Sequence, residues 1–284
     1  MKAKVRNRLL VAPYSIWMIG FIVIPLFFVA YYAFVNENNT FTLDNVKTFF
    51  DAINMKSFML SLELALKSTI ICIILAYPIA LIFRNSKTKK SSFLVYIFIL
   101  PMWMNGLLRL LAWLALIEKN GIINAMIGSI NNVLAGLNIK LPLLMIENTK
   151  AAVILGMVYD YLPFMILPLY NSLMKINEDT LNGARDLGAN KFQVFTRVIF
   201  PLSMPGIISG IMMVFIPALT TVAISDMLGG GKMLLIGNVI ERNFSNQYGR
   251  YKGAGLSMVL VIFIFIVMGI TNMFADKDED SVLI

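Results

Sequence analysis

The sequence contains no histidine and only one cysteine, and these two absences exclude several kinds of enzyme. Without imidazole side chains there is no His-based acid–base chemistry, no His metal ligand and no Ser-His-Asp triad. The single thiol, Cys72, cannot form an intrachain disulfide or supply a thiolate metal site by itself. The sequence also lacks nucleophile motifs and clusters of metal ligands. We therefore expect no metal, no cofactor bound by this chain and no enzymatic activity.

Charge is scarce as well. Charged residues make up 14% of the chain and hydrophobic residues 58%, with a mean hydropathy of +0.77. A soluble domain of this length does not need so many apolar side chains to fill its core, so the excess must face lipid. Runs of about 20 apolar residues, long enough to cross a bilayer as helices, recur along the chain.

We predict an all-α integral membrane protein with six spans. The predicted spans are Leu9–Phe34, Phe58–Phe83, Ser92–Leu116, Ala151–Leu173, Leu202–Met227 and Gly253–Ala275.

The basic residues outside these spans predict the orientation. If the N-terminus lies inside, the inner segments hold 13 of the 24 Lys and Arg residues and the outer loops hold nine. Because basic loops stay on the cytoplasmic side of a membrane, we expect both termini in the cytoplasm. The net charge of +8 then reflects topology and gives no support to nucleic-acid binding.

The loop between the fourth and fifth spans, residues 175–201, is long, mixed in charge and patterned for two short helices. The first is expected over Leu181–Leu187, capped by Asp179 or Thr180. Gly188 provides a break after it. The loop therefore has the composition of an exposed helical connector.

A second short helix is predicted after the break. Asn190, with Gln193 three residues later, forms the sequence pattern of a capping box. On physical grounds alone, the helix-break-helix unit fits two roles equally well. It can dock a soluble partner through its polar face, or it can rest on the membrane surface as an amphipathic connector.

Two stretches of this loop carry a longer motif. They read Asn182-Gly183-Ala184-Arg185-Asp186-Leu187-Gly188 and, after nine further residues, Val198-Ile199-Phe200-Pro201. The motif resembles the EAA loop of binding-protein-dependent ABC importer permeases. In that family the pattern is Glu-Ala-Ala, three residues, Gly, nine residues and then Ile-x-Leu-Pro.

In the family, this loop inserts into a cleft of the ATP-binding subunit and transmits its closure. The resemblance implies the same coupling role here for Asn182, Gly183, Ala184, Arg185, Asp186, Gly188 and Pro201. Four positions depart from the pattern, and two of them, Val198 for Ile and Phe200 for Leu, stay apolar. Asn182 replaces the usual Glu and removes a carboxylate, and Gly183 replaces Ala, which weakens the helix by about 1 kcal/mol.

The resemblance extends along roughly residues 61–271. The segments that carry it are Leu100–Asn105, Arg109–Trp113, Leu162–Met165 and Ile224–Ile240. They are similar to permeases of spermidine/putrescine transporters, most of all to their B-type subunit. This implies a type I ABC importer permease (MetI-like) fold. Residues 1–60 would form an N-terminal helix and outer loop, 61–275 the transmembrane domain and 276–284 a short cytoplasmic tail.

The same resemblance implies a set of partners. They are a second homologous permease, two copies of an ABC ATPase that bind ATP and Mg, an extracytoplasmic binding protein, membrane lipid and a polyamine substrate.

The run Gly229-Gly230-Gly231-Lys232 invites comparison with a phosphate-binding loop. A Walker A motif needs Ser or Thr after the Lys and a Gly six residues before that Lys. Met233 and Asp226 occupy those positions. We therefore expect no ATP site here, and we interpret the run as an outer gate or docking surface.

Ionisable residues within the spans are candidates for function, because charge is expensive in lipid. Glu63 and Lys67 are spaced i, i+4 and are expected to pair. Arg109 and Asp160 lie at similar depths, roughly 12 to 14 Å below the outer surface at 1.5 Å per residue. Two alternatives are open for Asp160: it neutralises Arg109, or it binds a cationic substrate directly.

A polyamine is a flexible multivalent cation, so its passage favours separated carboxylates with aromatic faces between them. The residues of these types are Asp226, Asp160, Glu63, Tyr159, Tyr161 and Trp103. For each aromatic taken singly, ordinary packing or interfacial anchoring is the alternative.

The sequence also allows other functions to be considered for the chain. A permease for another small cationic or polar solute has the same features. An ion-coupled secondary transporter would be expected to have internal repeats and midplane carboxylates, and no repeat is evident in the sequence. An intramembrane enzyme is the least expected alternative, because this sequence has no histidine, no nucleophile motif and no cluster of metal ligands.

Overall fold

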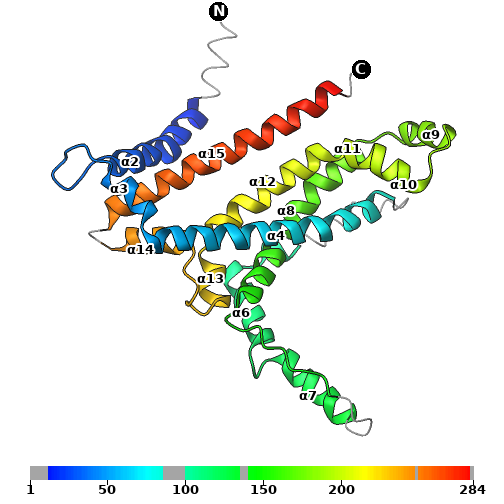
Figure 1. Cartoon of the computed structure of the whole chain (residues 1–284), viewed down its shortest axis with the longest axis horizontal. Coiled ribbons are helices and arrows are strands. Elements are labelled where there is room, and N and C mark those ends of the chain that lie inside the picture. Colours follow the sequence, from blue (N-terminus) through cyan, green and yellow to red (C-terminus); the bar gives the residue numbers. More distant parts are fainter. Residues whose placement is uncertain (1–11, 86–99, 135–139, 247–248, 282–284) are drawn as a thin grey trace, which may run out of the picture. The chain divides into compact units, whose positions relative to one another are not determined.

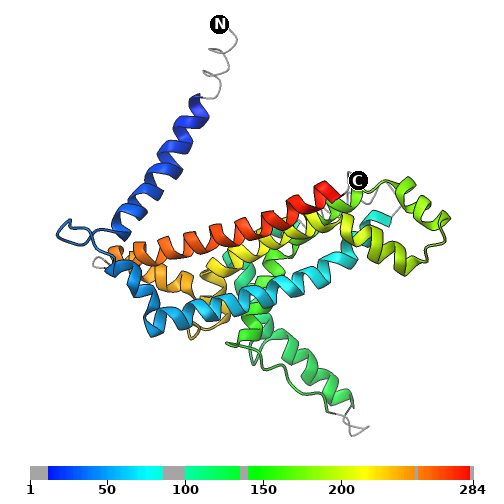
Figure 2. The ribbon, with the colours of Figure 1, turned by 45° about the horizontal axis from the view of Figure 1, so that its top comes forward.

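The computed structural model describes residues 12–85, 100–134, 140–246 and 249–281 (Figures 1 and 2). Most of these residues are helical, and within them the only β-pairing is a single bridge between Val35 and Phe41. The prediction of an all-α protein is confirmed. The chain divides into two compact units, described separately here: Met1–Ser57 with Asn238–Phe265, and Phe58–Gly237 with Ile266–Ile284.

Five helices of the described residues are long and apolar enough to cross a membrane. They are Ala12–Ala33, Ala52–Asn85, Gly106–Leu134, Lys150–Met174 and Arg250–Thr271. A further candidate is a pair of helices, Lys191–Leu202 and Met204–Thr220, bent by 58° at the break between them. Counted as one span, this pair brings the total to the six predicted.

The first unit contains the N-terminal span and the loop after it. Its elements are η1 (Ile19–Val23), α2 (Ile24–Ala33), α3 (Asp44–Lys47), η2 (Thr48–Phe50), most of α14 (Ile236–Ser245) and the start of α15 (Arg250–Ser281). Asn45 donates from its side chain to the carbonyls of Tyr32 and Val35, at 3.2 and 2.9 Å. The Arg250 guanidinium lies over the rings of Tyr32 and Tyr251. The Asn45 bonds fasten the end of α2 to α3, and the Arg250 contact fastens it to the start of α15.

The second unit is built around three long helices, each with proline inside it. They are α4 (Ala52–Asn85), α8 (Lys150–Met174) and α12 (Met204–Thr220). Helices α8 and α12 lie side by side (Figures 1 and 2). A Cβ atom at Gly206 would collide with the Pro168 carbonyl, and one at Gly210 would collide with Met165. These glycines therefore allow the two backbones to approach closely, as small residues do between membrane helices.

The third span is not the continuous helix that the apolar run Ser92–Leu116 predicts. Residues 86–99 lie outside the described part of the chain. After them, η3 (Leu100–Trp103) is a 3-10 turn, and α6 (Gly106–Ile117) starts anew at Asn105. The Asn105 side chain accepts hydrogen bonds from two backbone amides of the first turn. A hydropathy pattern does not register such a cap. Helix α7 (Ile122–Leu134) follows.

The fifth span also ends earlier than its prediction, Leu202–Met227. Helix α12 stops at Thr220, Thr221 is extended with ψ of 144°, and a separate short helix, α13 (Ala223–Leu228), follows. The run Thr220-Thr221-Val222 is entirely β-branched, which disfavours helix, and Pro217 has already removed one hydrogen bond from the preceding turn. The apolar run therefore contains a break that its hydropathy conceals.

Candidate functional site

The first helix of the loop at residues 175–201 begins earlier than predicted. Helix α9 spans Glu178–Asp186, and its cap is Asn177, which accepts a hydrogen bond from the Asp179 amide at 3.2 Å. The prediction of Asp179 or Thr180 as the cap is wrong. Glu178 and Asp179 instead occupy the first turn, where the helix dipole favours negative charge.

The break and the second helix follow the sequence prediction. Gly188 has φ of +84°, a left-handed conformation, and Ala189 N–H donates back to the Ala184 carbonyl. Helix α10 (Lys191–Val194) opens with both hydrogen bonds of a capping box between Asn190 and Gln193, each 2.9 Å. Both predicted features are confirmed.

The second helix then continues in two irregular steps. A π-helical turn, η5 (Phe195–Ile199), leads into α11 (Phe200–Leu202), which contains Pro201 in its first turn. A proline has no N–H and its ring collides with the carbonyl one turn back, so the wider turn before it relieves the clash. The Ser203 hydroxyl after α11 lies 2.8 Å from the Tyr77 hydroxyl of α4. The loop is thereby joined to α4 inside the second unit.

The motif residues lie mostly on the exposed side of α9. Asn182, Gly183, Arg185 and Asp186 are exposed, as is Gly188 just beyond the helix, whereas Ala184 is half-buried. Arg185 donates to the Asn182 side-chain oxygen at 2.9 Å, so the amide at position 182 keeps a basic partner without a carboxylate. A Cβ at Gly183 would meet open space. Leu181 anchors the opposite face in the core.

Leu187 and Phe192 are the most exposed large apolar side chains of the loop. Leu187 is 91% exposed and Phe192 is 73% exposed. Exposed large apolar side chains on a polar loop are candidates for binding another protein or the membrane. Periodicity alone does not reveal them, because it places Phe192 on the same face as Phe195 and Ile199.

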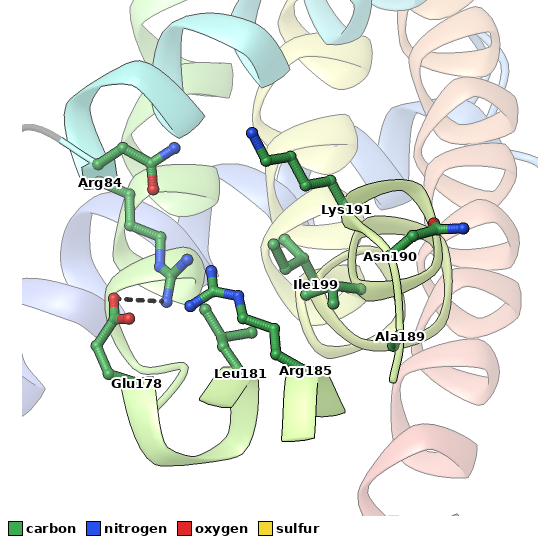
Figure 3. Close-up of a pocket in the computed structure, with 10 residues that line it drawn as sticks. Arg84, Glu178, Leu181, Arg185, Ala189, Asn190, Lys191 and Ile199 are labelled. Atoms are coloured by element: carbon green, nitrogen blue, oxygen red, sulfur yellow. Dashed lines mark hydrogen bonds and ion pairs between the residues drawn. The ribbon is translucent and has the colours of Figure 1, made fainter. Parts of the chain in front are cut away.

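Arg84, at the end of α4, is a functional candidate that the sequence did not single out. Its side chain is 5% exposed. Nε donates to the Leu173 carbonyl at 2.9 Å, and Nη2 donates to the Ile176 carbonyl at 3.2 Å and pairs with Glu178 at 3.4 Å (Figure 3). These partners are the last carbonyls of α8, the turn that follows and the start of α9. One side chain thus joins α4, α8 and α9.

Arg109 and Asp160 form an ion pair in the middle of the second unit. Nε and Oδ1 are 2.9 Å apart, and the side chains are 13% and 14% exposed. Arg109 also donates to the Pro101 carbonyl at 2.9 Å, and its guanidinium lies 5.8 Å from the centre of the Tyr159 ring. Trp113 meets that ring edge-on. Of the two alternatives for Asp160, the structure contains the pairing with Arg109.

The Glu63 carboxylate is held by two lysines. Lys67 lies 2.6 Å from one oxygen and Lys150 lies 2.8 Å from the other. The predicted i, i+4 pair is confirmed, and the second lysine ties α4 to the start of α8. Glu63 is thus in contact with both helices through lysine side chains.

The remaining path candidates are dispersed over the second unit. Tyr161 donates to the Pro217 carbonyl of α12 at 3.3 Å. Trp103 is 84% exposed at the end of η3, and Asp226 is exposed on α13. Among the described residues, Glu63 and Trp103 make no hydrogen bond, ion pair or ring contact with Asp160. Among the path candidates, the structure thus brings Tyr159 and Asp160 together around Arg109.

The glycine run after α13 forms a tight turn against the segment before α8. Gly230 and Gly231 have φ of +61° and +66°, and Gly230 packs so closely on Asn148 that a side chain at 230 would collide with it. Lys232 borders a cavity of about 340 Å³ together with Lys119, Glu147 and Asn148. No part of this turn has the Walker A sequence.

Comparison with known proteins places these features in a family. Residues 68–277 match the family described as binding-protein-dependent transport system inner membrane component. The chain is 36% identical to the spermidine/putrescine transport system permease protein PotB of Haemophilus influenzae over 270 residues, 92% of each chain. It is 36% identical to PotB of Escherichia coli over 260 residues, 89% of this chain and 90% of the other.

Two solved structures have the same fold. One is a crystal structure of a bacterial ABC transporter involved in the import of the acidic polysaccharide alginate, with a TM-score of 0.63 and 17% identity over 96% of this chain and 98% of the other. The second is the bacterial alginate ABC transporter in complex with an alginate pentasaccharide-bound periplasmic protein. Its TM-score is 0.68, with 18% identity over 97% and 96% of the two chains.

Proposed function

Because the chain belongs to the family of inner membrane components of binding-protein-dependent transport systems, we propose that it forms half of a path for polyamine import. It is a multi-pass membrane permease subunit with the fold of ABC importers. Spermidine and putrescine are the substrates that the names of its 36% identical relatives give for those proteins. The cationic nature of these substrates agrees with the carboxylates and aromatic rings of the second unit.

The proposed assembly contains a second, homologous permease and two ATPase subunits that bind ATP and Mg. An extracytoplasmic binding protein delivers the substrate, as the periplasmic protein of the alginate transporter suggests by analogy. Both termini and the loop 175–201 would face the cytoplasm, in agreement with the distribution of Lys and Arg.

One observation carries the coupling role of the loop: Arg84 joins the start of α9 to the ends of α4 and α8. ATPase closure would displace α9, and this displacement would reach both helices through the guanidinium. The second connection, between Tyr77 and Ser203, would carry it to the base of α12. ATP-driven motion would then alternate the access of the path.

The coupling role is tested by copurification of the chain with its ATPase. We expect the variant Arg185→Glu with Gly188→Glu to lose the ATPase, because bulk and negative charge enter the exposed face of the loop. The second permease should still copurify, which checks that the variant is folded. Lys119→Glu, a charge reversal at a distant loop, is the matched control. Retention of the ATPase by the double variant would contradict the coupling role.

In the path, Asp160 would receive a substrate ammonium group only in competition with Arg109. The Tyr159 ring and the Asp160 carboxylate already contact the Arg109 guanidinium, so both groups are suited to a cation. Asp226, Tyr161 and Trp103 would provide further contacts along the route. Uptake of spermidine into proteoliposomes should fall strongly in the variant Asp160→Asn with Asp226→Asn. Unchanged uptake would remove both carboxylates from the path.

Import of another small cationic or polar solute is the second candidate, because the same fold serves an acidic polysaccharide in the alginate transporter. Stimulation of ATP hydrolysis by the loaded binding protein distinguishes the two. We expect stimulation with spermidine or putrescine and none with arginine. An ion-coupled mechanism is tested in the same proteoliposomes: uptake driven by an ion gradient without ATP would contradict the proposal.

A further inference from the structure

A cavity of about 520 Å³ lies beside the Arg84 connection, between the end of α4 and the helices of the loop. Three cationic side chains line it from three different elements: Arg84 from α4, Arg185 from α9 and Lys191 from α10. Figure 3 shows both guanidinium groups at the same side of this space, with Lys191 above them. Glu178 is the only acidic side chain among the described residues that line it.

The positive charge of this cavity is not balanced within the described structure. Glu178 is 70% exposed and reaches Arg84 at 3.4 Å, the longest contact that Arg84 makes. Arg185 donates to the neutral side chain of Asn182. Three cations and one carboxylate leave a formal charge of +2 around one space. Like charges that share a cavity repel each other unless an anion lies between them.

We propose that this cavity binds a phosphate group, supplied by the headgroup of an anionic membrane phospholipid or by a soluble phosphate ion. Guanidinium groups present planar N–H donors that match phosphate oxygens, and such charge-assisted hydrogen bonds are short and strong. Asn190 adds an amide at the rim of the same cavity.

The place of the cavity in the fold favours the lipid as the source. Arg84 lies in the last turn of α4, a 34-residue helix whose apolar sequence is long enough to cross a membrane. The end of such a helix reaches the depth of the lipid headgroups, and basic pockets at the cytoplasmic ends of membrane helices bind anionic headgroups. A phosphate here would bridge α4, α9 and α10 and hold the loop against the spans.

Binding is tested on the purified transporter complex in neutral detergent, by its thermal unfolding temperature. The probes are short-chain phosphatidylglycerol, inorganic phosphate, short-chain diacylglycerol and sodium chloride at matched ionic strength. We expect phosphatidylglycerol to raise the unfolding temperature, and diacylglycerol and sodium chloride to leave it unchanged. If phosphatidylglycerol stabilises the complex at a concentration at least tenfold lower than inorganic phosphate does, the lipid is the source of the phosphate group. Stabilisation by inorganic phosphate alone identifies the soluble ion.

Two variants locate the site. Lys191→Gln removes one exposed cation from the cavity, and the concentration of probe needed for half-maximal stabilisation should rise about tenfold, as expected for one charge-assisted contact. Arg197→Gln is the matched control, because it removes an exposed cation of the same loop that does not line the cavity. Adding Arg185→Gln to Lys191→Gln should abolish the stabilisation.

Two results would overturn the proposal. The first is that neither phosphatidylglycerol nor inorganic phosphate stabilises the wild-type complex. The second is that Lys191→Gln and Arg197→Gln weaken the effect equally, because general attraction to a basic loop would then account for it.

Discussion

The ion pair of Arg109 and Asp160 and the cluster around Arg84 handle buried charge in opposite ways. In the first, one cation meets one carboxylate at 2.9 Å, and both are nearly equally buried. In the second, Arg84 is 5% exposed, but its acidic partner is 70% exposed and backbone carbonyls supply the two shorter contacts. A charged side chain within a span therefore needs a partner of opposite charge. A basic side chain at the end of a span can instead donate to free helix carbonyls, and its positive charge is then not neutralised.

The largest effect is expected from breaking the balanced pair. Arg109→Ala or Asp160→Ala alone leaves an uncompensated buried charge and should lower the free energy of unfolding by about 3–5 kcal/mol. Removing both residues, as Arg109→Met with Asp160→Leu, should cost much less, because no charge is left behind. Thermal or denaturant unfolding of the three variants measures the difference. If the single variants and the double variant lost the same free energy of unfolding, the two charges would not be compensating each other.

The cluster at the end of α4 should respond less, but still clearly. Arg84→Gln loses its bonds to the Leu173 and Ile176 carbonyls, and leaving these buried groups unpaired costs about 1–3 kcal/mol. It should also reduce the substrate transported per ATP hydrolysed, since the connection between α9 and the spans is lost. Lys175→Gln, at the end of α8, is the control and should retain the wild-type ratio. If Arg84→Gln kept the wild-type stability and the wild-type ratio of substrate transported to ATP hydrolysed, Arg84 would not connect α9 to the spans.

The asymmetry of that cluster predicts a small effect at its acidic member. Glu178→Gln should change the free energy of unfolding by less than about 1 kcal/mol, because an exposed partner contributes little to an ion pair. Comparing the free energies of unfolding of Glu178→Gln and Arg84→Gln, measured under the same conditions, separates the contribution of the carbonyl contacts from that of the ion pair. A loss in Glu178→Gln as large as that in Arg84→Gln would mean that the carboxylate is the main partner.

The smallest expected change lies on the exposed face of α9. Gly183→Ala should stabilise the helix by up to about 1 kcal/mol, because alanine favours helix and open space surrounds the position. A slightly higher unfolding temperature, with unchanged ATPase copurification, is the expected result. Destabilisation of the permease by the added methyl group, measured without the ATPase, would contradict the open space around position 183.

Local patterns in the sequence were enough to predict the spans and much of the loop. Apolar runs identify membrane helices because the bilayer imposes their length, and a capping box involves residues only three apart, as in Asn190 and Gln193. The i, i+4 contact of Glu63 with Lys67 is of the same local kind.

The depth of Arg109 and Asp160 in their spans indicated one distant pair, but other features that depend on distant contacts were missed. The carbonyl partners of Arg84 lie 89 and 92 residues away, and Lys150 lies 87 residues from Glu63. No spacing rule connects such residues. The breaks at Asn105 and at Thr221 were missed for another reason, since hydropathy reports whether a residue suits lipid and not whether its backbone is helical.

The glycine contacts between α8 and α12 determine how a force on the loop is distributed. Gly206 and Gly210 bring the two backbones together so closely that sliding one helix along the other would drive Pro168 or Met165 into the facing chain. Close packing of this kind opposes sliding of α8 along α12. In the proposed coupling, a force on the loop 175–201, which joins their ends, would therefore turn one body instead of opening a gap between two.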